Sequence, residues 1–348
     1  MERLLVVRLG SLGDLVHTLP AVSAIRRTWP ALEIDWLVDA VHREFLTLVP
    51  VITRVMTLED RTLGAWLRAR RTLRARRYDV AVDFQGLIKS AVLSRLSGAR
   101  RVTGFARDAL RERAAALFYT ERVEVGSGHH VVEKNLRLAR ALGAKAEALE
   151  FPLTDVPSPN VAAFLAAARE PFALVNPGAA WPNKRWPPDR FGEVCRAIRE
   201  RHGLNSVVLW GPNEQAVADA VVAAAGGSAV AAPPTRLPDL VALGRHARLV
   251  VSGDTGPLHI AMALGVPAVA LFGPTDPARN GPWVPADISL SRYDGCDCHY
   301  ERRCRRDAAR WCLGTIAVNE VVAAVDRRLA PAGTAAPSRP VPLGGGRD

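Results

Sequence analysis

The chain has 348 residues, of which 49% are hydrophobic and 23% are charged. This length and hydrophobic content exclude a chain that is disordered throughout, and they suffice for two domains with buried cores. No uncharged apolar run reaches the ~18 residues that a membrane-spanning helix needs. The N-terminus leads directly into an apolar strand without the pattern of a signal peptide, so we expect a cytoplasmic protein.

The net charge of +11 at pH 7 comes almost entirely from arginine, because the only lysines are Lys89, Lys134, Lys145 and Lys184. Such a charge suits nucleic acid, anionic lipid or phosphorylated sugars, and it is equally explained by a compositional preference for arginine. No basic motif interleaved with aromatic residues, as in nucleic-acid-binding modules, occurs. We therefore expect no nucleic-acid partner, and any attraction to concern a membrane surface or an anionic substrate.

The first half of the chain alternates predicted strands with predicted helices. Strands are predicted at 4–7, 34–38, 54–58, 80–84 and 101–104, and helices at 15–27, 41–48, 63–77, 91–96 and 129–142. Pro20 is expected to kink or restart the first helix. The alternation predicts one α/β domain over residues 1–150.

Asp14 stands at the turn between the first strand and the first helix. In a parallel sheet, this position faces the ligand crevice at the carboxyl ends of the strands. The G-x-x-G-D pattern around it differs from the dinucleotide fingerprint, which argues against a nucleotide-linked dehydrogenase. Asp14 is therefore a candidate general base, with capping of the helix as the alternative reading.

The second half begins after a segment at 151–170, which is rich in proline at its start and lacks a helical pattern there. This segment is predicted to be an interdomain linker. Strands are then predicted at 172–176, 206–210, 249–251 and 268–272, and helices at 189–201, 215–225, 237–246, 258–264 and 313–329. We expect a second α/β domain over 171–312, a closing helix over 313–330 that packs back on the first domain, and a disordered tail over 331–348.

The stretch from Leu249 to His259 is a strand, a tight glycine turn and the start of a helix. This order places free backbone N–H groups and the positive end of a helix dipole at one point, which favours phosphate binding. The next strand ends in the turn Gly273 to Asp276 at the same sheet edge. The plainer reading is that Asp254 only caps the helix and Gly256 only forms the turn.

Four of the five cysteines gather near the end of the chain, at Cys296, Cys298, Cys304 and Cys312, while Cys195 stands alone. Cytoplasmic cysteines are normally reduced. Zinc is conceivable with His299 nearby, but the spacing lacks the paired C-x-x-C of zinc ribbons and fingers. We expect no metal.

Six segments, taken together and in this order, resemble the heptosyltransferases of glycosyltransferase family 9, which build the inner core of bacterial lipopolysaccharide. The segments are 8–21, 83–90, 176–186, 211–214, 254–259 and 273–276. The resemblance covers residues 1 to about 330. The Asp83 segment and the region from Arg111 to Tyr119 look most like the type I branch, which adds the first heptose to the 3-deoxy-octulosonic acid of the lipid A precursor. The cysteine cluster and the loop Ala179 to Trp181 depart from the type I pattern.

The resemblance implies a GT-B architecture, in which two Rossmann-like domains face each other across a cleft. It implies that the second domain binds an ADP-heptose donor and that the first binds a lipid-anchored core acceptor. The protein would act at the cytoplasmic face of the inner membrane, and the reaction would need no cofactor. Asp14 would accept a proton from the acceptor hydroxyl and give inversion, and Lys184 would neutralise the departing ADP. The implied donor-binding residues are Gly178, Lys184, Glu214, Asp254, Thr255, Gly256 and His259, and the implied acceptor-binding residues are Gly13, Gln85, Lys89 and Arg111.

Two rival functions remain. One is transfer of another sugar to another core or lipid-linked acceptor by a member of the same family. The other is a non-catalytic protein that binds a nucleotide-sugar or another anion. The joint presence of Asp14, Lys184 and Asp254 argues against the second, since binding alone needs no base opposite a leaving group.

Overall fold

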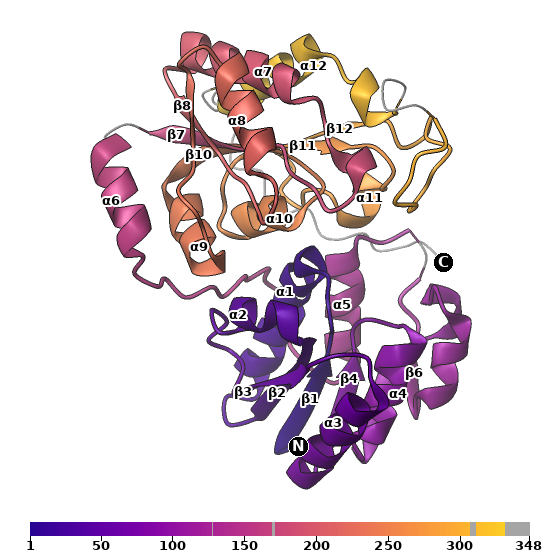
Figure 1. Cartoon of the computed structure of the whole chain (residues 1–348). Helices are drawn as coiled ribbons and strands as arrows, with labels where there is room; N and C mark the ends of the chain where they lie inside the picture. The colour runs from indigo at the N-terminus through magenta and orange to yellow at the C-terminus, as the bar shows by residue number, and fades with distance from the viewer. Residues whose placement is uncertain (127, 169–170, 307–310, 331–348) are drawn as a thin grey trace.

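The computed structural model describes residues 1–126, 128–168, 171–306 and 311–330. Within these ranges the chain forms two α/β halves, one stacked on the other, each with a parallel sheet between helices (Figure 1). This is the GT-B arrangement that we expected. The tail predicted over 331–348 lies outside the described residues.

The first half contains a six-stranded parallel sheet with the strand order β3-β2-β1-β4-β5-β6. Its strands are β1 (Arg3–Val7), β2 (Glu33–Asp39), β3 (Arg54–Leu58), β4 (Val80–Asp83), β5 (Arg101–Phe105) and β6 (Glu121–Val123). The central strands β1 and β4 are buried almost throughout, because helices cover both faces of the sheet. The edge strand β6 was not predicted, since its three residues are only partly buried and form no apolar run.

Helices lie on the two faces of this first sheet. They are α1 (Leu12–Thr28), α2 (Arg43–Leu46), α3 (Leu63–Arg76), α4 (Ile88–Leu96) and α5 (Val131–Ala141), with 3-10 turns η1 (Ala40–His42), η2 (Arg107–Ala109) and η3 (Arg113–Phe118). Pro20 does not interrupt α1, contrary to our expectation. Residues 15–25 of α1 are all buried, so packing outweighs the one backbone hydrogen bond that proline cannot make.

The second half repeats the plan with the strand order β12-β11-β10-β7-β8-β9, again all parallel. The strands are β7 (Phe172–Asn176), β8 (Asn205–Val208), β9 (Ala229–Ala231), β10 (Ala247–Gly253), β11 (Ala268–Phe272) and β12 (Ile288–Ser291). The helical elements are η4 (Pro182–Lys184), α7 (Pro188–His202), α8 (Gln215–Ala224), α9 (Leu237–His246), α10 (Gly256–Ala263), α11 (Pro277–Asn280), η6 (Leu313–Thr315) and α12 (Val318–Leu329). The short strands β9 and β12, at the two edges, were not predicted.

The segment between the halves is more ordered than predicted. The range 151–170 includes a helix, α6 (Pro159–Ala168), which packs against α9 of the second half. Within α6 the side chain of Val161 is buried. The start of α6 was not predicted, because prolines usually mark a loop. Pro159 is the first residue of the helix, a position where proline is tolerated.

The closing helix α12 packs on the second half and not back on the first, which corrects our expectation. Its neighbours are α7, β11 and β12. The buried side chains of Val321 and Val325 belong to the core of the second half. Ion pairs from Asp326 to Arg201 and from Arg328 to Asp287 fix the same placement.

The two halves meet along α1 and α10, whose surfaces are in close contact. A Cβ on Gly256 would lie 2.6 Å from the Leu12 side chain, and one on Gly13 would lie 2.4 Å from the His259 ring. Glycine at these positions therefore lets the two helices approach closely. Among the described helices, none is both long and apolar enough to cross a membrane.

Candidate active site

A cavity of about 810 Å³ lies between the two halves, where the carboxyl ends of their central strands face each other. Residues that follow β1, β4 and β5 line it from the first half, and residues that follow β7, β10 and β11 line it from the second. Its lining includes five basic side chains and three acidic ones. These are Arg8, Arg111, Lys134, Lys184 and Arg279, against Asp14, Asp254 and Glu301. The cavity therefore favours an anionic ligand.

Asp254 is the centre of a hydrogen-bonded network on the second half. It follows β10, and its Oδ2 accepts hydrogen bonds from Lys184 Nζ at 2.5 Å and Thr275 Oγ1 at 2.7 Å. Its Oδ1 lies 3.0 Å from His259 Nε2 and accepts a hydrogen bond from Asn280 Nδ2 at 2.9 Å. The side chain is only 5% exposed. The network joins η4, α10 and α11 with the turn after β11.

Burial alone would raise the pKa of Asp254, but the hydrogen bond with His259 and the charge of Lys184 outweigh it and hold this pKa far below the usual range. Asp254 is thus a permanent carboxylate. The simpler reading, in which Asp254 only caps α10, does not describe this carboxylate, because its hydrogen bonds are with the side chains of Lys184, His259, Thr275 and Asn280. Capping of α10 by a side chain is not observed at Thr255 either.

Lys184 is placed by a tight contact between its loop and the end of β10. A Cβ on Gly253 would lie 2.8 Å from the Lys184 carbonyl oxygen, so only glycine permits this approach. The Lys184 ammonium also donates to the Asp254 carbonyl oxygen at 3.3 Å and lies 4.6 Å from the centroid of the Trp181 ring. The ammonium is therefore fixed at the cavity wall while only two of its three N–H groups have partners among the described residues.

Thr255 is held by a second, smaller network. Asn176 Nδ2 donates to Thr255 Oγ1 at 2.9 Å, to Ser252 Oγ at 3.0 Å and to the Gly178 carbonyl at 3.2 Å. Asn176 ends β7 and is buried, so it ties the loops after β7 and β10 together. Thr255 and Gly256 line the cavity at the start of α10, as the sequence predicted.

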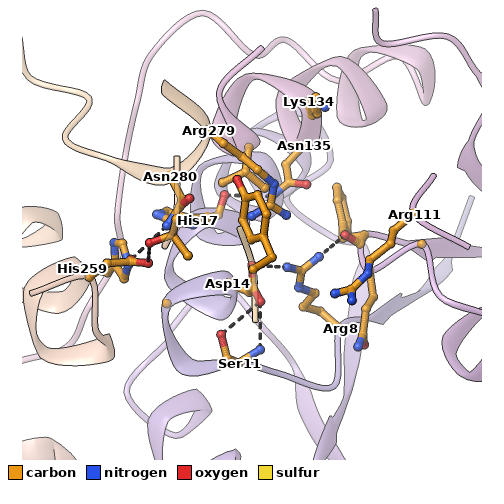
Figure 2. A pocket seen from close by; sticks show the side chains of 18 of the residues that line it. Arg8, Ser11, Asp14, His17, Arg111, Lys134, Asn135, His259, Arg279 and Asn280 are labelled. Carbon is orange, nitrogen blue, oxygen red and sulfur yellow. Dashed lines mark hydrogen bonds and ion pairs between the residues drawn. The ribbon is translucent and has the colours of Figure 1, made fainter. Parts of the chain in front are cut away.

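Asp14 lies on the opposite wall, near the start of α1, as Figure 2 shows. Its Oδ1 forms an ion pair with Arg8 at 2.5 Å, and its Oδ2 accepts hydrogen bonds at 3.0 Å from the backbone N–H and the hydroxyl of Ser11. The bonds with Ser11 are those of a helix cap. Asp14 is nevertheless 28% exposed and lines the cavity, so capping and a second role are compatible.

Burial raises the pKa of Asp14, but the guanidinium groups of Arg8 and Arg279, with the hydrogen bonds from Ser11, outweigh burial and lower this pKa below the usual 3.8. Arg8 is itself anchored, since its other nitrogen donates to the Phe84 carbonyl after β4. The Asp14 carboxylate is therefore ionised at neutral pH and held in one orientation, although it is an intrinsically weak base.

The predicted acceptor residues are only partly brought together. Gln85 lines the cavity and accepts a hydrogen bond from the Leu9 backbone N–H at 2.9 Å, and Arg111 lines the same wall with an exposed side chain. Gly13 lines the cavity too, yet its nearest neighbour is the His259 ring. Lys89 lies within α4 and is not among the residues that line the cavity, so its predicted role in binding the acceptor stays a prediction.

Two predicted donor residues also lie outside the cavity lining. A Cβ on Gly178 would lie 2.2 Å from a carboxylate oxygen of Glu214, and Glu214 accepts a hydrogen bond from the Gly211 backbone N–H at 3.1 Å. Arg185 is 3.6 Å from the same carboxylate. Through these contacts, Glu214 connects the loop after β7 with the loop after β8.

Several lining residues were missed by sequence reasoning. They are Arg8, His17, Lys134, Asn135, Thr275, Arg279 and Asn280. His17 had a usable signal, since it follows Asp14 by three residues and so shares its helix face. Arg279 and Asn280 had none, because α11 is a helix of only four residues after an irregular turn.

The four clustered cysteines do lie together, with Cys298 Sγ at 3.7 Å from Cys304 Sγ, and all are free thiols. Within the described part of the chain, no group of three or more His, Cys, Asp or Glu side chains has a geometry that could hold a metal ion. The loop between Cys298 and Cys304 contributes His299, Tyr300 and Glu301 to the cavity wall. The cluster therefore supports that wall.

Comparison with known proteins relates most of the chain to one family. The sequence model described as Glycosyltransferase family 9 (heptosyltransferase) matches residues 66–309. The lipopolysaccharide heptosyltransferase 1 of Pseudomonas aeruginosa is 32% identical over 321 residues, which cover 87% of this chain and 87% of the relative. The lipopolysaccharide heptosyltransferase 1 of Salmonella typhimurium is 31% identical over 295 residues, which cover 80% of this chain and 90% of the relative.

Solved structures show the same fold. The Escherichia coli heptosyltransferase WaaC with ADP superposes with a TM-score of 0.71 at 24% identity, over 93% of this chain and 97% of that one. The Escherichia coli ADP-heptose heptosyltransferase II superposes with a TM-score of 0.74 at 21% identity, over 94% and 98%.

Proposed function

Because the chain belongs to glycosyltransferase family 9, the heptosyltransferases, we propose that it transfers a heptose from ADP-heptose to the 3-deoxy-octulosonic acid of the lipid A precursor, with inversion at the anomeric carbon. One observation carries this proposal beyond family membership. A hydrogen-bonded carboxylate, Asp14, and a fixed cation, Lys184, face one cavity from opposite halves of the molecule.

Asp14 acts as the general base in this proposal. It takes the proton of the acceptor hydroxyl while the hydroxyl oxygen attacks the anomeric carbon of the donor sugar. The ion pair with Arg8 keeps the carboxylate oriented but lowers its pKa, so proton transfer alone gives a modest gain. Positioning of the two substrates must supply much of the rate acceleration.

Lys184 acts on the leaving group. The C–O bond between the sugar and the diphosphate breaks, and ADP departs with the bonding electron pair. An ammonium held at the cavity wall by Asp254 stabilises the charge that develops there. The backbone N–H groups at the start of α10, beside Thr255 and Gly256, are suited to hold the diphosphate.

We assign the donor to the second half and the acceptor to the first. The second assignment is supported by Arg8 and Arg111, which line the first-half wall near Asp14. Guanidinium groups pair with carboxylates and phosphates through two parallel hydrogen bonds, and the proposed acceptor carries both kinds of group.

We also propose that the protein binds peripherally to the cytoplasmic face of the inner membrane. Helix α3 supports this attachment, since it contains no acidic residue and exposes Leu63 and Leu67. Its arginines Arg68, Arg70, Arg71 and Arg74 are exposed as well. Co-sedimentation with vesicles containing phosphatidylglycerol, but not with neutral vesicles, is the expected result.

The proposed reaction is tested with purified protein, a panel of nucleotide-sugars and deacylated core acceptors. ADP-heptose with an acceptor ending in 3-deoxy-octulosonic acid should give the fastest turnover. Faster turnover with another donor or acceptor would favour the related-transferase reading, to which the hydroxyl-free loop Ala179 to Trp181 gives some support. Tight binding without turnover would favour a nucleotide-sugar-binding protein.

A further inference from the structure

The imidazole of His17 lines the cavity without a hydrogen-bond partner. The residue is 2% exposed, and neither Nδ1 nor Nε2 has a partner within the described residues. A buried polar group that lacks a partner is costly, so such groups are rare in folded proteins unless something else satisfies them. Because the ring borders a ligand cavity, a ligand group is the natural partner.

The protein groups around the His17 ring form no hydrogen bond with it within the described residues. The His259 ring is 4.4 Å away between centroids, edge to face, but its Nε2 is bonded to Asp254. The His130 ring is 5.6 Å away, with its Nε2 3.0 Å from the Gly281 carbonyl and its Nδ1 accepting from the Val132 N–H. His259 Nδ1 has no partner within the described residues, and neither neighbouring ring is hydrogen-bonded to His17.

Asn135 likewise leaves the ring unpaired. Its amide nitrogen donates to the His17 backbone carbonyl at 3.0 Å and to Thr18 Oγ1 at 3.3 Å, while its Oδ1 has no partner within the described residues. These bonds fix the helix backbone and so the direction of the imidazole. The ring is rigidly presented, which lowers the entropy cost of binding a ligand group.

The charge state of His17 narrows the kind of ligand. Burial lowers the pKa of the imidazole well below 6.5, and the nearby His259 and His130 rings act in the same direction, against the opposing charge of Asp254. A neutral imidazole offers one N–H donor and one acceptor nitrogen. That pair matches a sugar hydroxyl, which both accepts and donates, better than it matches a phosphate, which only accepts.

The position of His17 indicates which part of the substrate it contacts. It stands one helical turn after Asp14, and on its other side the ring meets His259 of the Asp254 network; Figure 2 labels it between Asp14 and His259. In the proposed reaction, the group between the base and the donor half is the sugar being transferred. We propose that His17 binds a hydroxyl of the transferred sugar, an inference that rests on the proposed function.

The test separates the sugar from the nucleotide. Isothermal titration with ADP and with ADP-heptose gives, for each variant, the gain in affinity that the heptose provides. His17→Phe keeps a planar ring for the contacts with His259 and Trp283 while it removes both nitrogens. We expect ADP affinity within about twofold of wild type and a loss of roughly five- to tenfold in the gain from heptose, the size of one neutral hydrogen bond.

Three comparisons keep the result interpretable. His17→Gln, which restores a donor and an acceptor, should recover part of the gain. His246→Phe, at an exposed histidine outside the cavity lining, should change neither affinity. Thermal unfolding of each variant identifies any that fails to fold, and His17→Gln then carries the test with its gain compared directly with wild type.

Two outcomes overturn the assignment in different ways. If wild type gains affinity from heptose and His17→Phe keeps that gain, or loses ADP and ADP-heptose affinity equally, His17 is only a packing residue between the two halves. If wild type gains nothing from heptose, the proposed donor itself is wrong and the assignment of His17 falls with it.

Discussion

The two aspartates that face the cavity are held in contrasting ways. Asp254 contacts four side chains from four different elements, and its carboxylate is 5% exposed. Within the described residues, the Asp14 carboxylate has an ion pair with Arg8 and hydrogen bonds from Ser11, both of which lie close to it in the chain, and it is 28% exposed. All of the hydrogen-bonding capacity of Asp254 is used within the protein, whereas Asp14 keeps an open side toward the cavity.

The difference teaches how one site can contain a structural carboxylate and a reactive one. The buried carboxylate of Asp254 accepts four contacts from side chains, positions Lys184 and His259, and has no accessible lone pair for a proton from substrate. The carboxylate of Asp14 also has partners on both oxygens, but it has fewer of them and stays partly exposed at the cavity wall. The halves therefore contribute unlike parts: a preformed network on the second half and an open, charged wall on the first.

The largest expected effect on turnover comes from changing Asp14, the carboxylate that stays partly exposed to the cavity. Asp14→Asn removes the proposed base while it keeps the size of the side chain, and turnover should fall by about 10²–10⁴-fold. ADP affinity should stay close to wild type, since Asp14 is on the half opposite the proposed nucleotide site. Steady-state kinetics and an ADP titration measure both. Activity within a few-fold of wild type would leave Asp14 as a helix cap alone.

The second largest expected effect on turnover comes from changing Lys184, a member of the hydrogen-bonded network around Asp254. Lys184→Ala removes the cation beside the leaving group and leaves Asp254 without its ion-pair partner, so turnover should fall by roughly 10²–10³-fold. The affinity for ADP-heptose should fall more than the affinity for the acceptor. Separate titrations of ADP-heptose and acceptor decide this. An equal loss for both substrates would contradict the division of the two between the halves.

A smaller effect is expected at the rim of the first half. Arg111→Ala should raise the KM for the anionic acceptor by about tenfold, the size of a lost charge-assisted hydrogen bond, and leave ADP affinity unchanged. Arg113→Ala is the matched control, because Arg113 lies on the same segment, is exposed and is outside the cavity lining. If both variants behave alike, Arg111 is merely one solvated arginine among many.

The smallest effect concerns pH. Because the neighbouring guanidinium groups hold the pKa of Asp14 below its usual 3.8, the base remains deprotonated as pH falls, until that lowered pKa is reached. Between pH 8 and 5, kcat/KM should therefore show no loss attributable to protonation of this carboxylate. An acidic limb with an apparent pKa near ~6 that disappears in Asp14→Asn would show that Asp14 titrates differently from what its neighbours dictate.

The sequence predicted best what depends on local order along the chain. Asp14, Asp254 and Thr255 were placed at the crevice because Asp254 and Thr255 follow a strand directly and Asp14 lies in the first turn of the helix after one, and the strand ends of a parallel sheet gather at one edge. Whether Lys89 reaches the cavity wall depends on how α4 is placed against it, and the sequence pattern does not contain that information. The edge strands escaped because three or four partly buried residues give no pattern.

What the sequence did not predict depends on packing between distant segments. The apolar stripe of α12 was visible, but such a stripe does not say which sheet it covers. The pairing of Arg8 with Asp14, and the place of Arg279 in the same wall, depend on side-chain directions and on the way the two halves meet. The unpaired state of His17 is visible only once its neighbours' own hydrogen bonds are known.

The placement of α12 on the second half has a consequence for how the molecule is connected. Among the described residues, every strand and helix up to α5 belongs to the first half, and every one from α6 onward belongs to the second. Over the part of the chain that the structure describes, the backbone thus passes from one half to the other a single time, just before α6. A gene divided at that passage would encode two fragments, each with a complete sheet. Co-expression of the fragments should restore the cavity through the contact of α1 with α10, without any covalent bond between them.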